Sequence, residues 1–325
     1  MAFTLDFERP IVELEQKIQE LKGLGSNHKV PKGGVQLDLN TEISQLESKL
    51  QGLRQQVYKG LTPWQRVQMA RHPKRPYTLD YIGKFMTDFI ELHGDRLFSD
   101  DHALIGGFAT FEGRRVMLVG HQKGKDTKEN LFRNFGSAHP EGYRKALRLM
   151  QTAGKFKLPI FCFVDTPGAY PGVGAEERGQ SQAIAFNLRE MARIPVPIIV
   201  SVIGEGGSGG ALGIGVGDRI LVMENAYYSV ISPEGCAAIL WKDRAKAPDA
   251  ANSLKLTGPD LKALGIIDDV VPEPLGGAHR DPDQAAQNLK AAIKKHLDEM
   301  LQLDPKQILA GRAEKYRRLG VYTES

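Results

Sequence analysis

The chain has 325 residues, of which 41% are hydrophobic and 25% carry a charged side chain. This is the balance of an ordinary globular protein, and the length allows one large or two modest domains with a substantial core. The formal net charge of +4 is weak for a nucleic-acid-binding protein, which usually shows a dense basic stripe, so we expect no nucleic-acid partner.

The N-terminal residues lack the features of a targeting segment. Residues 1–8 show no basic region followed by an apolar run, so no secretory signal is predicted. No stretch approaches the roughly 20 apolar residues that a membrane span requires. We therefore expect a cytoplasmic protein with no membrane partner.

Residues 1–78 are predicted to form an N-terminal helical extension. Two runs of apolar residues recur at steps of three and four, and a Gly/Pro-rich break over 23–34 separates them. The runs are Ile11, Leu14, Ile18 and Leu21, then Leu39, Ile43, Leu46, Leu50, Leu53 and Val57. Each helix would carry one apolar stripe, so we expect an antiparallel hairpin that docks on the main body or on another subunit.

A short helix should follow the hairpin. Thr62 is a suitable N-cap, and Pro63 suits the first helical position, so the helix is predicted to run toward Arg71. Residues 71–76 are basic and contain two prolines, which disfavour the helical conformation in the residues before them. We interpret this segment as an exposed loop, with contact to an anionic group as the alternative.

Residues 79–300 are predicted to form an α/β domain, followed by a polar C-terminal tail over 301–325. Near-continuous apolar strands alternate with helices, which indicates a sheet covered on both faces. The expected strands are 103–111 and 114–119, paired as a hairpin, then 159–164, 196–203, 219–223 and 227–231. The expected helices are 141–155, 176–193, 210–217, 233–241 and 283–303.

Two glycine-rich turns, each following a buried strand, are the strongest candidates for a functional site. The first spans 165–174 and the second spans 204–211. At the beginning of a helix the backbone N–H groups lack intrahelical partners, and glycine removes the β carbon that would hold a ligand away from them. Two such turns on adjacent strands would form an array of donors for an oxyanion. Asp165 and Glu205 stand beside them, where a turn-bracing role is favoured.

Three other interpretations of the glycine-rich segments are weaker. Gly206-x-Ser208-x-Gly210 matches the nucleophile elbow of a serine hydrolase, and Asp268, Asp269 and His279 follow in the right order, but such a pattern arises easily where Gly and Ser are dense. Residues 120–125 are one residue short of a phosphate-binding loop. Residues 168–174 fit a dinucleotide fingerprint poorly, because they contain Pro171.

The chemistry of metals and disulfides is not expected in this chain. The eight histidines show no metal-binding spacing, so we predict no metal. The two cysteines, Cys162 and Cys236, are too few for a disulfide framework or a zinc site, and both sit among apolar neighbours.

Several long blocks of the sequence, in the right order, resemble one family. They are Asp165-Thr166-Pro167-Gly168-Ala169-Tyr170-Pro171-Gly172, Glu176-Glu177-Arg178-Gly179-Gln180, Gly204-Glu205-Gly206-Gly207-Ser208-Gly209-Gly210-Ala211-Leu212, Tyr228-Ser229-Val230-Ile231-Ser232-Pro233-Glu234-Gly235-Cys236, Pro140-Glu141-Gly142-Tyr143-Arg144-Lys145-Ala146-Leu147-Arg148 and Gly120-His121-Gln122-Lys123-Gly124. From about residue 7 to residue 279 the chain is similar to the carboxyltransferase α subunits of bacterial and plastid acetyl-CoA carboxylase.

The resemblance implies a crotonase-like α/β fold of repeated ββα units, preceded by the N-terminal helical hairpin. It implies an α2β2 enzyme whose β subunit carries a zinc ribbon and most of the acyl-CoA site. A separate biotin carboxyl carrier protein would bring the biotin cofactor, and biotin carboxylase would use ATP upstream, within the full complex. The reaction would convert acetyl-CoA to malonyl-CoA for fatty acid biosynthesis.

For the site, we expect the amides of Gly209 and Gly210 to form an oxyanion hole on the biotin side, with help from Gly168 or Ala169. The substrate-binding residues are predicted to be Gly206, Gly207, Tyr170 and Pro171. The ureido anion of biotin could itself take the proton from the methyl group of acetyl-CoA, so no side-chain base is required. This agrees with the lack of an evident acid–base pair in the sequence. The alternatives are a serine hydrolase that uses Ser208 and a non-catalytic assembly subunit.

Overall fold

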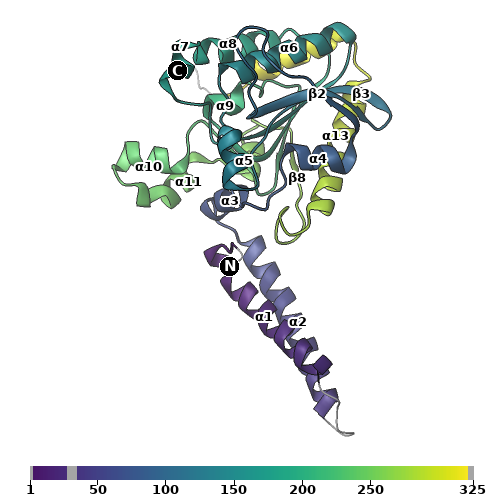
Figure 1. Cartoon of the computed structure of the whole chain (residues 1–325), viewed down its shortest axis with the longest axis vertical. Helices are drawn as coiled ribbons and strands as arrows, with labels where there is room; N and C mark the ends of the chain where they lie inside the picture. The colour runs from purple at the N-terminus through teal and green to yellow at the C-terminus, as the bar shows by residue number, and fades with distance from the viewer. Residues whose placement is uncertain (1–2, 28–34, 321–325) are drawn as a thin grey trace, which may run out of the picture.

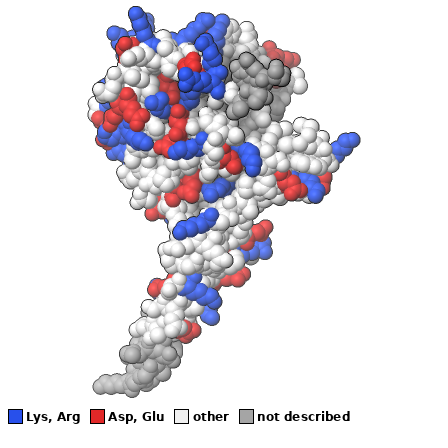
Figure 2. Space-filling model, turned by 180° about the vertical axis from the view of Figure 1, so that it is seen from behind, with Lys and Arg blue, Asp and Glu red and all other residues white. Residues whose placement is uncertain are grey.

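The computed structural model describes residues 3–27 and 35–320, which form an α/β body and a long helical hairpin that projects from it (Figure 1). In the described part of the chain, no helix combines the length and the apolar character needed to cross a bilayer. On the face of the body seen in Figure 2, basic and acidic side chains are interspersed.

The hairpin consists of helices α1 (Arg9–Asn27) and α2 (Val35–Lys59), which follow the short 3₁₀ helix η1 (Asp6–Glu8). The predicted antiparallel arrangement is confirmed, because Glu15 pairs with Arg54 at 2.6 Å and Lys22 pairs with Glu47 at 2.6 Å. Apolar side chains that include Ile11 and Leu50 are buried between the helices. Residues 28–34 of the predicted break lie outside the described residues.

The base of the hairpin docks on the body through polar contacts. Arg280, which lies just before the helix Pro282–Met300 of the body, donates to Glu15 at 2.8 Å. Tyr58 donates to the buried carboxylate of Glu8 at 2.6 Å, and His279 lies 3.6 Å from the same carboxylate. The hairpin is therefore held at its base on the body, as expected for helices that are too thin to stand alone.

One mixed sheet forms the centre of the body. Its described strand order is β1-β2-β3-β4-β5-β6-β8, with β7 paired to the far end of β5. The pairs β1–β2 and β2–β3 are antiparallel, and all the others are parallel. The strands are β1 (Thr87–Glu91), β2 (Leu104–Phe111), β3 (Arg114–His121), β4 (Ile160–Thr166), β5 (Ile198–Gly207), β6 (Arg219–Met223), β7 (Tyr227–Ser229) and β8 (Asp269–Val271).

Helices cover the sheet, which explains why β4 and β5 are buried at every residue. Helices α6 and α8 pack together on one side, and α4 packs with α13 on another (Figure 1). The helices of the body are α3 (Pro63–Ala70), α4 (Thr78–Phe85), α5 (Thr127–Phe132), α6 (Pro140–Phe156), α7 (Val173–Glu177), α8 (Gln180–Met191), α9 (Ser208–Leu212), α10 (Pro233–Trp241), α11 (Ala247–Leu254), α12 (Gly258–Ala263), α13 (Pro282–Met300) and α14 (Pro305–Arg317), with 3₁₀ helices η2 (Asn134–Gly136) and η3 (Arg244–Lys246). The predicted α/β fold is confirmed.

Some predicted boundaries are wrong. The helix expected over 176–193 is interrupted, because Gly179 adopts a left-handed conformation (φ 82°) between α7 and α8. The strand expected to end at 203 continues to Gly207, since Glu205 pairs with Tyr227 of β7. The small-residue helix expected over 210–217 is the single short helix α9.

The segment 301–325 is not only a polar tail, because residues 305–317 form α14. Arg312 of this helix is buried and donates to Asp218 at 2.7 and 2.9 Å. It also donates to the carbonyls of Met191, Ile194 and Val196. A largely polar helix therefore packs on the body through Ile308 and a buried guanidinium, a feature that hydrophobic periodicity does not reveal.

Candidate functional site

The two glycine-rich turns lie against each other at the carboxyl ends of β4 and β5. The two strands are parallel neighbours, and Thr166 faces Gly206 across the pair. A β carbon on Gly207 would lie 2.2 Å from the carbonyl oxygen of Pro167. One on Gly210 would lie 2.4 Å from the amide nitrogen of Ala169. Glycine is thus required at 207 and 210 because the backbones of the two turns touch.

Gly209 has a different environment from its neighbours. A β carbon there would meet only Ile184 Cδ1, at an ordinary contact distance of 3.7 Å. Packing within this chain therefore does not require glycine at 209. Gly209 also stands near the start of α9, where backbone N–H groups have no acceptor one turn earlier in the helix. An open amide at this position is the arrangement that a ligand needs.

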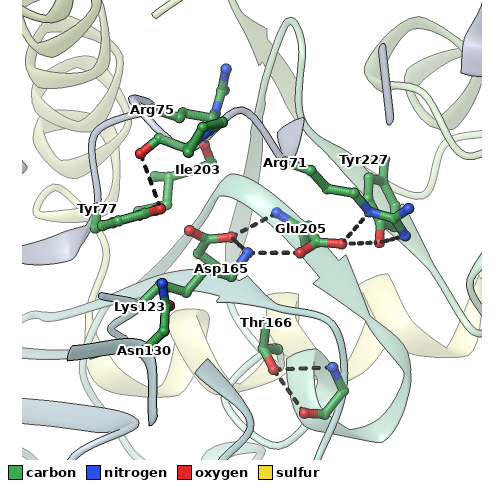
Figure 3. A network of polar contacts seen from close by, with 12 residues as sticks. Arg71, Arg75, Tyr77, Lys123, Asn130, Asp165, Thr166, Ile203, Glu205 and Tyr227 are labelled. Atoms are coloured by element: carbon green, nitrogen blue, oxygen red, sulfur yellow. Dashed lines mark hydrogen bonds and ion pairs between the residues drawn. The ribbon is translucent and has the colours of Figure 1, made fainter. Parts of the chain in front are cut away.

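Hydrogen bonds within the first turn narrow the set of candidate donors. Gly168 donates its N–H to Thr166 Oγ1 at 3.1 Å, and the same hydroxyl donates to the Gly168 carbonyl at 2.8 Å (Figure 3). Tyr170 donates its N–H to the Ala138 carbonyl at 3.0 Å. Of the two residues predicted to help from this turn, Gly168 therefore has its amide engaged, and Ala169 is the better candidate.

Two pockets meet at the second turn. The first, of about 370 Å³, brings together both turns and the segment after β7; its lining is Pro167, Gly168, Ala169, Tyr170, Pro171, Glu176, Gln180, Ser208, Gly209, Val230, Ile231 and Ser232. The second, of about 350 Å³, is lined by Ser208, Gly209, Leu212, Tyr228, Ser229, Val230, Leu254, Leu261 and Ile266. Ser208, Gly209 and Val230 line both pockets, so Gly209 lies where the contents of the two pockets would meet.

The predicted site residues fall into two groups. Gly168, Ala169, Tyr170, Pro171 and Gly209 line the first pocket. The other three predicted residues, Gly206, Gly207 and Gly210, line neither of these two pockets and are buried. For Gly206 the reason is packing, because a β carbon would lie 2.8 Å from the carbonyl oxygen of Tyr227.

A buried network of charged groups lies behind the turns (Figure 3). Lys123 Nζ stands 2.7 Å from Asp165 Oδ1 and 2.8 Å from Glu205 Oε2. Asp165 Oδ1 also accepts the N–H of Glu205 at 2.9 Å. Asp165 and Glu205 thus brace the strand ends, as expected, while residues 120–125 supply a buried cation rather than a phosphate loop.

The network continues from Glu205 to Arg71. Arg71 Nε donates to Glu205 Oε1 at 2.7 Å, and Tyr227 donates its hydroxyl to the same oxygen at 2.8 Å. Arg71 also pairs with Glu234 at the start of α10. Burial alone would raise the pKa of Glu205, but Lys123 and Arg71 outweigh it and lower the pKa to about 2. Burial raises the pKa of Asp165.

The basic segment 71–76 is therefore not the exposed loop that we predicted. Arg71 faces Glu205, and Arg75 is wholly buried, where it donates to Glu273 at 3.0 Å and to the Ile203 carbonyl at 2.7 Å. The anionic groups that Arg71 and Arg75 contact are carboxylates of this chain, so contact of the segment with an anionic ligand stays a prediction. Sequence alone did not reveal them, since the partners lie more than 100 positions away.

The hydrolase interpretation has the right local backbone but not the catalytic partners. Ser208 has a positive φ of 54°, as a residue on a nucleophile elbow would. His279, however, stacks on His72 with ring centroids 3.7 Å apart and lies beside Glu8 at the base of the hairpin. It lines a separate pocket of about 320 Å³ with both of those residues. The histidine that a Ser–His pair requires is thus committed elsewhere. The two candidate acids, Asp268 and Asp269, pair with Lys315 and Lys262.

Glu8, His72 and His279 are also the group of potential metal ligands that the described residues bring together. Their arrangement does not suit a metal ion. The two imidazole rings are stacked, so their in-plane lone pairs do not converge, and His72 Nδ1 already accepts the N–H of Lys74 at 3.2 Å. Arg280 lies 3.8 Å from Glu8 as well. We assign this cluster to docking of the hairpin.

Comparison with known structures defines the class of protein first. The fold matches transcarboxylase 12S, with a TM-score of 0.52 at 23% identity over 67% of this chain and 42% of that one. It also matches a Pseudomonas malonate decarboxylase hetero-tetramer in complex with coenzyme A, with a TM-score of 0.55 at 18% identity over 68% and 90%. The fold is therefore that of the crotonase-like carboxyltransferases, as predicted.

Sequence comparison then identifies the family. Residues 4–320 match the family model described as acetyl co-enzyme A carboxylase carboxyltransferase-like. The α subunit of acetyl-coenzyme A carboxylase carboxyl transferase from Geobacter metallireducens is 57% identical over 322 residues, which is 99% of each chain. The protein belongs to the family of acetyl-CoA carboxylase carboxyltransferase α subunits, and it is a subunit of an enzyme.

Proposed function

We propose that this chain, assembled with a carboxyltransferase β subunit as α2β2, transfers a carboxyl group from carboxybiotin to acetyl-CoA. The observation that carries the proposal is Gly209, whose open backbone faces two pockets although nothing in this chain forbids a side chain there. A biotin carboxyl carrier protein would deliver the group, and biotin carboxylase would load it upstream.

The residues around Gly209 fit the ureido ring of biotin. A bulky ring can approach the backbone only where a β carbon is missing, and the open position at 209 meets this condition. Bound carboxybiotin would supply the carboxyl group and a ureido oxygen on which negative charge develops as that group leaves. The amides of Gly209 and Ala169, which line the first pocket, are the donors that this chain can direct to such an oxygen, whereas Gly210 is buried behind them. Tyr170 and Pro171 would form the wall of the pocket beside them.

These amides would contribute by electrostatic stabilisation. Close packing of Gly207 and Gly210 on the first turn fixes the backbone on either side of Gly209, so little reorganisation is needed when charge develops. A single oxyanion-hole donor contributes on the order of 10²–10³ in rate, or about 3–4 kcal/mol. The effect requires that water be kept away, and apolar Leu212 and Val230 beside Gly209 serve that purpose once a partner covers them.

The surface beside the pockets suits a partner subunit. Val230 lines both pockets and is 79% exposed. Ile239 and Leu240, on α10, are 70% and 65% exposed. Exposed apolar groups at the mouth of a site mark a surface that another protein covers. We propose that the β subunit covers it and brings most of the acyl-CoA site and a structural zinc.

Two alternatives remain distinguishable. A serine hydrolase would need Ser208, whereas carboxyl transfer would not. A non-catalytic assembly subunit would bind the β subunit but contribute no group to the site, and the pocket geometry around Gly209 argues against it.

The direct test is reconstitution with a matching β subunit. Malonyl-CoA decarboxylation in the presence of biotin should require both chains and should be lost when either is left out. Full activity from the β subunit alone would contradict the proposal, and hydrolysis of esters by the isolated α chain would favour the hydrolase instead.

A further inference from the structure

We propose that Lys123 is a positioning residue for carboxyl transfer, because it holds the ends of β4 and β5 at the spacing that the two glycine turns require. The inference rests on the proposed function of those turns and adds a residue that does not touch the substrate. Lys123 follows β3, so three neighbouring strands of the sheet contribute to the arrangement (Figure 3).

Lys123, Asp165 and Glu205 form a buried cluster, which we call the clamp, that joins the end of β4 to the end of β5. The Lys123 ammonium group contacts Asp165 at 2.7 Å and Glu205 at 2.8 Å, one carboxylate from each strand that leads into a turn. Asp165 closes the triangle by accepting the Glu205 N–H at 2.9 Å. All three residues are buried. A change in the separation of the two strand ends would break at least one of these contacts.

The clamp is close to the turns in sequence and tightly packed in space. Asp165 is directly followed by Thr166, whose hydroxyl fixes Gly168, and Glu205 is followed by the residues that lead to Gly209. A β carbon on Gly204 would lie 2.5 Å from Asp165 Oδ1. The Asp165 carboxylate therefore packs directly on the backbone of β5 at Gly204, in addition to its hydrogen bond with the Glu205 N–H, so a displacement of the carboxylate would be passed to the strand that leads into the second turn.

The same network reaches the third segment of the pocket. Arg71 joins Glu205 to Glu234, and Glu234 lies two residues after the pocket-lining segment 230–232. Lys123 and Arg71 thus connect all three segments that surround Gly209. Neither cation lines the two pockets at this turn, so both act through other residues.

An ion-pair network is a costly way to gain stability, because burying charges removes their hydration. It is, however, directional, since each N···O contact fixes a distance that apolar packing would leave adjustable. Removing one partner leaves an unpaired charge in the interior. These properties suit a network whose role is to fix geometry, and they dictate a test that separates geometry from stability.

The test uses the α chain reconstituted with its β subunit and measures kcat and KM for malonyl-CoA together with the melting temperature. Lys123→Met should lower kcat by about tenfold to a hundredfold, the effect of a small misplacement of catalytic groups, with KM within about twofold. The double variant Lys123→Met/Asp165→Asn removes the unpaired charge. It should recover most of the melting temperature while kcat stays low.

If Lys123→Met fails to assemble with the β subunit, Asp165→Asn alone provides a milder test. The amide oxygen can still accept the Glu205 N–H, so the variant should fold, with kcat reduced severalfold. Arg312→Met is the matched control, because Arg312 is an equally buried cation whose partner Asp218 binds the opposite end of β5, at Ile198 N. It should lower the melting temperature and leave kcat of the folded enzyme unchanged.

The outcomes separate this inference from the proposed function. Recovery of kcat together with the melting temperature in the double variant would show that Lys123 only neutralises charge, and would overturn the inference. So would an equal loss of kcat in Arg312→Met, or full kcat in Asp165→Asn. A fully active Gly209→Ala variant would instead overturn the assignment of the turns, whatever Lys123 does.

Discussion

The backbone of Gly210 lies directly against that of Ala169, with only 2.4 Å between the position of a β carbon on Gly210 and the amide nitrogen of Ala169. One residue earlier, at Gly209, the nearest atom would be a flexible side-chain carbon at 3.7 Å. Adjacent glycines therefore have different reasons to be glycine: one for packing within the chain, the other for access to the backbone. The first two predictions follow from this difference.

Gly210→Ala should damage the fold. The new methyl group would clash with backbone atoms that cannot rotate away, so the two turns would have to separate. We expect a loss of about 1–3 kcal/mol, the usual cost of overpacking, and a lower melting temperature of the α chain. An unchanged melting temperature would show that the turns have room that the structure does not provide.

Gly209→Ala should have the opposite signature. Alanine is preferred to glycine in a helix by about 0.5–1 kcal/mol, and the methyl group fits, so the melting temperature should stay equal or rise. The rate of malonyl-CoA decarboxylation should fall by about a hundredfold or more, because the methyl group blocks approach to the amides.

Gly311→Ala serves as the control for Gly209→Ala. Gly311 lies in α14, with nothing within 4 Å of the position of its β carbon. The Gly311→Ala variant should be as stable as Gly209→Ala and fully active. If Gly209→Ala proves as active as this control, no ligand approaches the backbone at 209.

Ser208→Ala should retain carboxyl transfer. The serine already has a positive φ of 54°, a conformation that is strained for any residue with a β carbon, so replacing it by alanine should change the stability little. We expect kcat within about threefold of wild type, because the backbone rather than the hydroxyl would carry the chemistry. Ser208→Gly, which relieves the backbone conformation, is the control. A loss of about a thousandfold or more in both variants would favour a nucleophilic serine.

Acid should loosen the junction between hairpin and body through His72. Burial lowers its pKa from 6.5 to about 4, with neighbouring His279, Lys74 and Arg280 acting in the same direction and Glu8 opposing them. The unfolded chain thus binds the proton more readily. The stability due to neutral His72 is present above pH 6.5 and is lost as the pH falls toward 4.

His72→Phe should remove that part of the pH dependence. A phenyl ring can keep the stacking on His279 but cannot titrate. Between pH 7 and pH 4, wild type should lose on the order of 2–3 kcal/mol more than the variant, as the shift of the pKa implies. Melting temperatures of both proteins over this range give the comparison. Parallel curves for the two proteins would show that His72 is not titrating in this window.

Much of this architecture could be predicted from local sequence. The apolar periodicity around Ile11 and Leu50 indicated the hairpin, and the short apolar runs indicated the central strands. The donor turns were recognisable because a dense run of glycines directly after a buried strand is typical of a backbone that is approached closely. These are properties of neighbouring residues, which sequence displays directly.

Features that depend on distant residues were not predictable in the same way. Lys123 looks like part of a defective phosphate loop until the fold brings Asp165 and Glu205 to it. Gly209 and Gly210 are indistinguishable in sequence, and only the position of Ala169 separates their roles. Charged residues give no periodic signal when they are buried, because their partners are chosen by tertiary structure.

A crystal structure of the enzyme formed with the β subunit, with biotin bound, tests the central claim most directly. We expect the ureido oxygen to lie about 2.7–3.1 Å from the amide nitrogen of Gly209, with Ala169 on the adjoining side. A ureido ring bound away from both turns, with these amides facing solvent or protein, would contradict it.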